Sequence, residues 1–304
     1  MPEQLNRLKA LQDVLSQTCS VICDLYGVNE EEAFKRVETF IRENSERWRL
    51  NIPDINYDEP FCRMAYLYMN VAVHAALVEK ALTSYPVFET LLRSKANEGL
   101  DIHVCALGGG PGSELLGIIR FIEALVLPQV IHLDFVLLDR TREWDESWHA
   151  LKQGVDRQLR QEYGTDRSKW PASVSRSFLP LDVLSSADFL NFATRFSETD
   201  IFLFCYLTSE IKGSIDKFKD VFNLLVERAP AGALFLFIDR DEREVREAAQ
   251  QLISNNPNLN SLGTIRERGR LEDDLKDLGK WYINIPSLPR QRWSAFFTLG
   301  QKIS

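Results

Sequence analysis

Four glycines in residues 101–117 could bring the backbone against a ligand. Gly108, Gly109, Gly110 and Gly112 separate an apolar run typical of a buried strand from leucines and isoleucines at helical spacing. Glycine has no Cβ, so the backbone can adopt a positive φ and approach a ligand closely. A helix that starts directly after the turn adds free N–H groups and the positive end of its dipole. The pattern predicts the first strand, turn and helix of a nucleotide-binding α/β fold.

The spacing of these glycines separates two classes of ligand. A dinucleotide fingerprint G-x-G-x-x-G that begins at Gly108 requires glycine or alanine at position 113, where Ser113 stands. The stretch LGGGPGSE instead has the pattern G-x-G-x-G and resembles motif I of class I S-adenosylmethionine-dependent methyltransferases. The resemblance covers about residues 101–300 and implies that the four glycines bind S-adenosyl-L-methionine. A dinucleotide oxidoreductase and a purely structural glycine turn are the alternatives.

Acidic residues follow the next two expected strands. Asp139 ends HLDFVLLDR with Arg140 beside it, and Asp182 follows the apolar run in RSFLPLDVL. The resemblance implies that Asp139 accepts hydrogen bonds from the ribose hydroxyls and that Asp182 receives the adenine amino group. Arg140 then lies at the same cofactor-binding edge. The plainer interpretations are a solvated strand end for Asp139 and a helix cap for Asp182.

The fourth expected strand ends in the polar sequence CYLTSE. Ligands of open α/β sheets lie beyond the carboxyl ends of the strands, so we expect Cys205 beside the cofactor. We expect Tyr206 and Glu210 to face the methyl acceptor, with Glu210 as general base or substrate anchor. Alternatively, Glu210 caps the next helix. The segment departs from the DPPY and NPPY signatures of amino-group nucleic-acid methyltransferases, which leaves open a catalytically silent binding or scaffold protein.

A long apolar helix is expected over residues 61–82. Arg63, Tyr66 and Asn70 recur there at three- and four-residue steps and are predicted to line the acceptor side, or else to pack in the core. CRMAYLYMN together with LGGGPGSELLG resembles a eukaryotic group that includes fungal ribosomal RNA uridine-N3 methyltransferases, which implies an RNA acceptor. The basic segment 152–176 would serve such a role, or would form a solvated helix face.

The order of elements predicts one α/β domain behind a helical region. Residues 1–98 are predicted to form a helical N-terminal cap, and residues 99–304 the S-adenosylmethionine-binding domain. Alternating strand and helix patterns predict a Rossmann-like doubly wound sheet of about seven strands. The resemblance implies mostly parallel strands with an antiparallel last strand. The expected strands are residues 103–107, 132–138, 174–180, 201–206, 233–238 and 295–299, with one more near 280–285.

Composition narrows the class of protein. The chain is 45% hydrophobic and 26% charged, which is ordinary for a globular protein. No apolar run of about 18 residues is evident, so we expect no membrane partner. Five cysteines without a CxxC pair predict reduced thiols, no metal site, and a cytoplasmic or nuclear protein. The net charge of −8 favours a small-molecule acceptor over RNA, without excluding RNA. Nothing in the sequence indicates the oligomeric state.

Overall fold

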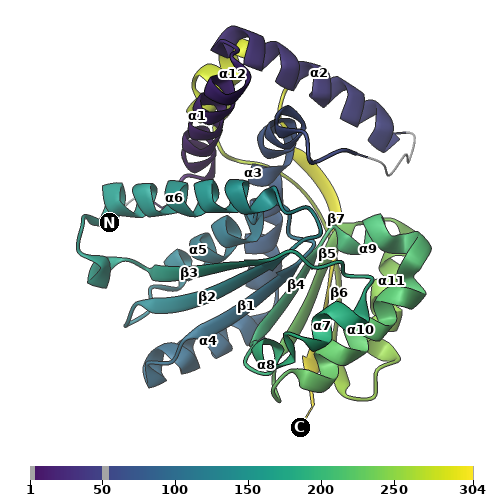
Figure 1. The fold of residues 1–304 in the computed structure, drawn as a ribbon. Helices are drawn as coiled ribbons and strands as arrows, with labels where there is room; N and C mark the ends of the chain where they lie inside the picture. The colour runs from purple at the N-terminus through teal and green to yellow at the C-terminus, as the bar shows by residue number, and fades with distance from the viewer. Residues whose placement is uncertain (1–3, 50–54, 304) are drawn as a thin grey trace.

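The computed structural model describes residues 4–49 and 55–303, arranged around one seven-stranded sheet (Figure 1). The strands lie in the order β3-β2-β1-β4-β5-β7-β6. They are β1 (Ile102–Leu107), β2 (Ile131–Leu138), β3 (Ala172–Leu179), β4 (Ile201–Cys205), β5 (Leu234–Arg240), β6 (Leu259–Arg270) and β7 (Arg292–Lys302). β1 to β5 pair in parallel, and β7 is antiparallel to both of its neighbours. The predicted Rossmann-like sheet with an antiparallel last strand is confirmed.

The strand order reverses between β1 and β4. The chain runs outward from β1 through β2 to β3 and then returns to the other side of β1 for β4. Such a switch point leaves a crevice at the carboxyl ends of the two central strands, where open α/β sheets bind their ligands. The glycine turn follows β1, and Tyr206 follows β4, so the topology brings both to this crevice.

Helices cover both faces of the sheet, which splits the buried side chains into two clusters (Figure 1). Along β4, Leu203 belongs to the cluster under α3, α4 and α5, while Phe202 and Phe204 belong to the opposite cluster under α10 and α11. This alternation follows from the two-residue repeat of a strand. The longer helices are α1 (Arg7–Tyr26), α2 (Glu30–Arg49), α3 (Pro60–Ser84), α4 (Pro86–Glu98), α5 (Ser113–Leu125), α6 (Trp144–Tyr163), α10 (Ile215–Arg228) and α11 (Arg243–Ser254). Short helices are α7 (Ser186–Leu190), α8 (Ala193–Phe196), α9 (Leu207–Ile211) and α12 (Lys280–Asn284).

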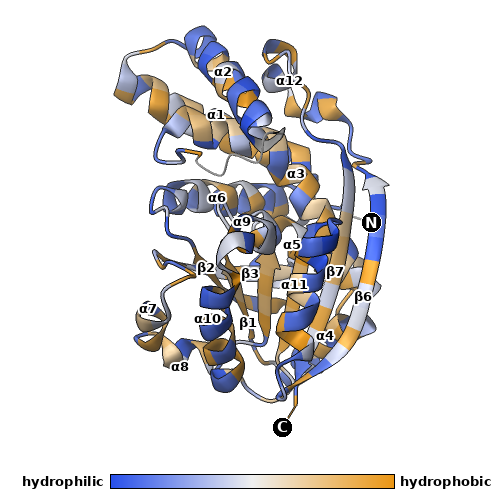
Figure 2. Cartoon of the chain, turned by 90° about the vertical axis from the view of Figure 1, so that its right-hand side faces the viewer, coloured by the Kyte–Doolittle hydropathy of each residue, from blue (hydrophilic) through white to orange (hydrophobic). Residues whose placement is uncertain are grey.

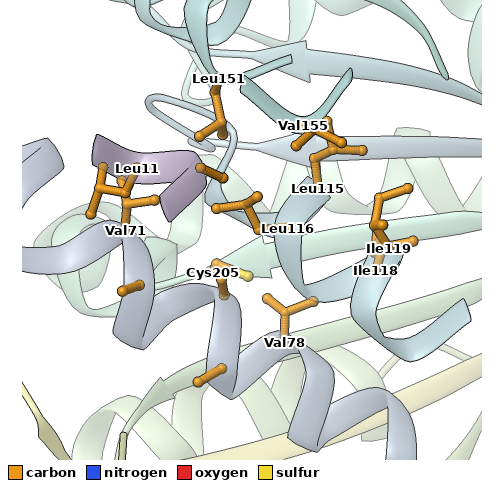
Figure 3. Packing of buried hydrophobic residues seen from close by; sticks show 14 of the residues in the cluster. Leu11, Val71, Val78, Leu115, Leu116, Ile118, Ile119, Leu151, Val155 and Cys205 are labelled. Atoms are coloured by element: carbon orange, nitrogen blue, oxygen red, sulfur yellow. The ribbon is translucent and has the colours of Figure 1, made fainter. Parts of the chain in front are cut away.

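α3 is the central helix of one layer. Pro60 occupies its first turn and the Glu59 side chain caps it, so the helix begins where its backbone N–H groups are satisfied. Val71 and Val78 of α3 pack beside leucines and isoleucines of α5 (Figure 3). By length and composition α3 could cross a membrane, contrary to the sequence expectation, but 89% of its most apolar window is buried inside the protein. That burial is typical of a core helix.

The helical N-terminal region shares its core with the sheet. Buried leucines and valines of α1 and α3 belong to the same cluster as the alternate residues of β1 and β2. Arg7 in α1 also pairs with Glu79 of α3 at 2.5 Å and with Asp273 at 2.8 Å. The domain boundary near residue 98 stays a prediction, while buried side chains on its two sides form one continuous cluster.

The expected strand at residues 280–285 is wrong, because this segment forms α12. The sixth strand is β6, whose sequence LNSLGTIRERGR is too charged to stand out as a strand. β6 lies at the sheet edge, its residues alternate between exposed and partly buried, and Figure 2 shows its largely hydrophilic colouring. Charged side chains on an edge strand discourage pairing with another chain. A register shift between Ser261 and Thr264 further hides the repeat.

Candidate functional site

The glycine turn after β1 has three positive φ angles, 63° at Gly108, 50° at Gly110 and 80° at Gly112. A Cβ on Gly108 would lie 2.9 Å from Leu207 Cδ1, and one on Gly112 would lie 2.4 Å from Trp148 Cε3. These two glycines are therefore needed for packing the turn itself. A Cβ on Gly110 would lie 3.7 Å from Trp144 Cε2, an ordinary van der Waals contact, so packing alone does not require glycine at this position.

Asp139 at the end of β2 joins the turn directly. Its Oδ2 accepts a hydrogen bond from the Gly110 N–H at 3.0 Å, and its Oδ1 accepts one from the Thr141 N–H at 2.9 Å. Burial raises the pKa of Asp139 to about 6, although the two N–H donors and Arg140 act in the opposite direction. The structure thus brings together two elements that the sequence predicted to share a ligand.

Three further carboxyl groups gather near Asp139, and we call the four the carboxylate cluster: Glu114, Asp139, Glu210 and Asp239. Burial raises the pKa of Glu114 and of Glu210 to about 7, and that of Asp239 to about 6. The charges of Asp139 and Asp239 raise the pKa of Glu210 further, which places all three within electrostatic reach. Protons shared among such groups are released when a cation binds beside them. The cluster favours a positively charged ligand.

Glu210 in α9 is exposed to solvent, yet burial among protein atoms is the largest cause of its raised pKa. Asp139 and Tyr206 are also partly reached by solvent, and burial likewise raises their pKa values. We place the candidate site at the carboxyl ends of β1, β2 and β4.

Glu114 and Asp239 were not among the predicted site residues. Glu114 stands in the first turn of α5, where its carboxylate accepts a hydrogen bond from the Ser113 hydroxyl at 3.5 Å. Asp239 is fully buried near the end of β5 and accepts hydrogen bonds from the Ser209 and Arg240 N–H groups. The sequence feature that could have indicated them is an acidic residue at or shortly after the carboxyl end of a strand, β1 for Glu114 and β5 for Asp239. Cys205 itself is buried, and burial and the charge of Glu114 raise the pKa of its thiol.

Tyr206 is strained. Its φ of 58° lies in the left-handed region, which bulky residues rarely adopt. The ring stacks on His74 of α3 at 4.3 Å between centroids and 19° between planes. Strained residues cluster at functional sites because surrounding contacts must hold them in place. Tyr206 therefore connects the end of β4 to α3 in one fixed geometry.

Of the three residues predicted on α3, Arg63 binds the chain itself. Its guanidinium donates hydrogen bonds to the carbonyls of Tyr57 and Asp58 at 2.8 and 2.9 Å, which holds residues 55–59 against α3. Tyr66 packs with Tyr57 and Trp144 in a cluster whose ring centroids lie 5.3–5.6 Å apart. The packing of Tyr57 against Tyr66 and Trp144 was not predicted from the sequence.

Asn70 is buried, with 2% of its surface exposed, and its Nδ2 has no hydrogen-bond partner among the described residues. One turn further along α3, the Nε2 of His74 is likewise buried without a partner there. Asn70 was predicted from the sequence as a substrate residue, but His74 was not assigned. The role of all three predicted α3 residues stays a prediction.

The remaining predicted cofactor residues lie at the rim. Arg140 is exposed after β2, and its charge lowers the pKa of Asp139 and Glu210. Asp182 is also exposed, and its Oδ1 accepts the Leu184 N–H at 2.9 Å within a local turn. Asp182 therefore shapes the loop after β3, and its contact with an adenine stays a prediction. Among residues 4–49 and 55–303, no group of three His, Cys, Asp or Glu side chains is arranged to hold a metal ion.

The basic segment 152–176 is largely engaged in internal contacts. Lys152 pairs with Asp156 at 2.5 Å, Arg157 with Asp13 of α1 at 3.4 Å, and Arg176 pairs with an acidic residue of α6. Its two interleaved aromatic residues also bond internally, through Tyr163 to Glu123 and through the buried Trp170 to a backbone carbonyl. These contacts fix α6 against its neighbours.

Among known proteins, this chain is similar only to solved structures and not to a family model or a curated sequence. No protein-family model matches the chain, and no curated protein matches it. Several of the similar solved structures are described as methyltransferases. The N-methyltransferase NodS from Bradyrhizobium japonicum WM9, in complex with S-adenosyl-L-homocysteine, is 9% identical over 73% of this chain and 91% of its own, with a TM-score of 0.38.

Two others have the same degree of likeness. A methyltransferase from Methanosarcina mazei is 9% identical over 67% of this chain and 93% of its own, with a TM-score of 0.38. An O-methyltransferase family protein from Burkholderia thailandensis is 11% identical over 81% of this chain and 61% of its own, with a TM-score of 0.40. At these values no residue is assigned by comparison. The resemblance to fungal ribosomal RNA uridine-N3 methyltransferases has no support here.

Proposed function

We propose that the chain is an S-adenosylmethionine-dependent methyltransferase that acts on a small-molecule acceptor. The observation that carries the proposal is the hydrogen bond from the Gly110 N–H to the Asp139 carboxylate, which joins the glycine turn to an acidic strand end. The carboxylate cluster around it suits a cation, and S-adenosyl-L-methionine combines a ribose with a positive sulfonium. The residues present therefore fit this cofactor.

Each part of the site has a distinct role in the proposal. The backbone of the turn at Gly110 would face the methionine portion, and Asp139 would bind the ribose hydroxyls. The cofactor, when bound, supplies an electrophilic methyl group. The protein's main task is then to orient the acceptor and exclude water. Tyr57, Tyr66 and Trp144 form the apolar cover that excludes it.

Tyr206 and Glu210 are the proposed acceptor-side residues. Tyr206 is held rigidly by His74, so it can position an acceptor group at the end of β4. Glu210 has a pKa of about 7, close to the value at which a carboxylate best accepts a proton near neutral pH. In this proposal Glu210 takes the proton of an acceptor hydroxyl or amine as the methyl bond forms.

The net charge of the chain and the internal ion pairs of the basic segment 152–176 favour a small-molecule acceptor over RNA. The net charge of −8 repels a polyanion, and basic side chains of residues 152–176 already pair with carboxylates. Single-stranded RNA binding also relies on exposed aromatic rings, whereas Trp170 is buried. These ion pairs offset the charges of Lys152, Arg157 and Arg176.

Calorimetric titration with S-adenosyl-L-methionine tests the proposal, with Gly110→Ala as the variant and Gly232→Ala as its matched control. Both glycines have positive φ, 50° and 85°, so both substitutions strain the backbone, but Gly232 lies in open space away from the site. We expect wild type and the control to bind, and Gly110→Ala to bind at least tenfold more weakly. Absence of binding by wild type would overturn the proposal.

A labelled-methyl transfer assay on fractionated small-molecule and RNA extracts then separates an enzyme from a silent binding protein. We expect label in the small-molecule fraction, and none after substitution of Glu210→Gln. Cofactor binding without transfer to any fraction would instead support a scaffold protein with a retained cofactor. Transfer to RNA alone would contradict the proposed substrate class.

A further inference from the structure

Asp239 is a fully buried carboxylate near the end of β5. Its Oδ2 accepts a hydrogen bond from the Ser209 N–H at 2.8 Å, and its Oδ1 accepts one from the Arg240 N–H at 2.8 Å. Burial of a carboxylate costs stability unless hydrogen bonds compensate for the lost water. Because no part of its side chain is exposed, Asp239 acts through the residues that it binds and not by contact with a ligand.

The bond from Ser209 to Asp239 replaces a local helix cap. Ser209 lies in the first turn of α9, the helix that follows β4, and Tyr206 occupies its N-cap position without a capping hydrogen bond from its side chain. The first N–H groups of a helix have no partner within the helix, so they need one from elsewhere. Asp239 supplies it for the Ser209 N–H from another strand, 30 positions along the chain. The start of α9 therefore depends on β5.

The turn from Tyr206 to Glu210 is attached to β5 at two points. The Tyr206 N–H donates to the carbonyl of Ile238 at 2.8 Å, one residue before the carboxylate that binds Ser209. Within the turn, the Ser209 hydroxyl donates to the carbonyl of Tyr206 at 3.0 Å. These bonds surround Tyr206, whose φ of 58° has to be held by its neighbours. Loss of the carboxylate would remove one of the two attachments and allow the turn to relax.

Glu210 directly follows Ser209, so the bond to Asp239 also fixes the backbone from which the Glu210 side chain extends. Burial is the main cause that raises the pKa of Glu210 to about 7, and the charges of Asp139 and Asp239 raise it further. The titratable and charged groups that act on Glu210 are Asp139 and Arg140 after β2, Asp239 and Arg240 of β5, and the phenols of Tyr57 and Tyr66. Asp239 thus influences Glu210 both through the backbone and through its charge.

We propose that Asp239 is a positioning residue for methyl transfer, which fixes the turn carrying Tyr206 and Glu210 without contacting the acceptor. The inference rests on the proposed function, because that function assigns Tyr206 and Glu210 to the acceptor side. The cofactor side is held separately, by the bond between Gly110 and Asp139 after β1 and β2. Loss of the Asp239 carboxylate should therefore impair methyl transfer while leaving the adenosine end of the cofactor bound as before.

Asp239→Asn tests the proposal, with Asp200→Asn as its matched control. The amide keeps the size of the side chain but turns one oxygen into an N–H donor, which opposes one of the two bound N–H groups. Asp200 is likewise a buried carboxylate that accepts a backbone N–H, from His103 at 2.9 Å. It directly precedes β4, at the opposite end of that strand from Tyr206. Both variants should lose stability, but only Asp239→Asn should alter the site.

Carbon-13 NMR of the Glu210 carboxyl, assigned with Glu210→Gln, provides a readout that a loss of stability alone would not move. We expect Glu210 to titrate at lower pH in Asp239→Asn than in wild type, because a negative charge has been removed from its surroundings. In Asp200→Asn it should titrate as in wild type. The rate of labelled-methyl transfer to the small-molecule extract should fall at least tenfold in Asp239→Asn and stay within about twofold of wild type in Asp200→Asn. Calorimetry should show unchanged binding of S-adenosyl-L-homocysteine in both.

Wild-type titration of Glu210 or wild-type transfer in a folded Asp239→Asn variant would overturn the inference, as would an equal loss of transfer in Asp200→Asn. If Asp239→Asn does not fold, amide NMR of wild type provides the test. We then expect the Ser209 N–H to exchange with solvent at least tenfold more slowly than in the unfolded chain, and free exchange would overturn the inference. If wild type transfers no label but Glu210 titrates as expected in each variant, the proposed function fails while the link between Asp239 and Glu210 stands.

Discussion

The backbone N–H of Gly110 donates to Asp139 Oδ2 across 3.0 Å, which ties the turn after β1 to the end of β2. Thr141 donates to the other carboxylate oxygen, so both oxygens are held by backbone groups. Each oxygen keeps a second lone pair for a ligand. Asp139 thus sets the shape of the turn and presents hydrogen-bond acceptors to the crevice at the same time.

Asp139→Asn should therefore affect both binding and stability. The amide keeps the size of the side chain but turns one acceptor into a donor that opposes the Gly110 or Thr141 N–H. We expect S-adenosyl-L-methionine affinity to fall at least tenfold and the free energy of unfolding to fall by about 1–3 kcal/mol. Calorimetry and urea unfolding measure the two effects. Asp220→Asn, exposed on α10, is the control, and unchanged affinity in Asp139→Asn would contradict the role.

The carboxylate cluster predicts that cofactor binding releases protons. The pKa values of its members, about 6 to 7, are raised chiefly by burial, so these groups are partly protonated near neutral pH. A bound sulfonium favours their ionised forms and lowers these pKa values. Binding should therefore tighten as pH rises through this range and level off above it.

The number of protons released can be measured by calorimetry at about pH 6.5 in buffers of different ionisation enthalpy. S-adenosyl-L-homocysteine is the matched ligand, because it lacks the sulfonium charge but keeps the rest of the molecule. We expect the binding of S-adenosyl-L-methionine to release more protons than the binding of S-adenosyl-L-homocysteine. Equal release by the two ligands would show that the cluster does not respond to the sulfonium.

The same pKa values predict the dependence of stability on pH without ligand. Their folded values lie above the unfolded values of 3.8 and 4.5, so the folded state binds more protons between about pH 4 and 7. Their contribution therefore favours folding at low pH and is lost as pH rises through the folded pKa values. Urea unfolding of wild type and Glu210→Gln should show a smaller loss with rising pH in the variant. Identical pH profiles would contradict this assignment.

The sequence predicted the parts of the site that depend on local pattern. Gly108, Gly110 and Asp139 follow apolar strands, and parallel strands bring their carboxyl ends to one edge. The position of β6 was missed, because an edge strand with charged residues lacks a clear two-residue repeat. α12 was mistaken for a strand because a five-residue apolar segment is too short to show its period.

Contacts between distant parts of the chain could not be predicted from local sequence patterns. His74 meets Tyr206 across 132 positions of sequence, and Arg290 reaches α3 through the backbone of Met69. Neither pairing leaves a periodic mark in the sequence. The sequence also did not predict that Asn70 Nδ2 is buried without a hydrogen-bond partner among the described residues, because a buried polar residue on an apolar helix normally has one.

The ring of Tyr206 should contribute to both stability and activity. Tyr206→Gly relieves the strain of its φ of 58° but removes the ring that stacks on His74. Relief of strain recovers about 1 kcal/mol, but loss of the partly buried ring and of its stack costs about 3 kcal/mol, so the free energy of unfolding should fall by about 2 kcal/mol. We expect kcat to fall at least tenfold, because the acceptor loses its positioning ring. Tyr206→Phe keeps the ring and should stay closer to wild type in kcat, whereas equal losses in both variants would assign the role to the hydroxyl.

Gly117 of α5 should be among the least tolerant positions of the fold. A Cβ there would lie 2.5 Å from the carbonyl oxygen of Ala75 and 2.7 Å from Val78 Cβ, so α3 would have to move away from α5. Because α3 carries His74 and Asn70, this shift would also disturb the acceptor side. We expect Gly117→Ala to lower the free energy of unfolding by about 1–3 kcal/mol, despite the better helix propensity of alanine. Gly213→Ala, in open space, is the control and should not destabilise, while an equally stable Gly117→Ala would show that the two helices can separate without cost.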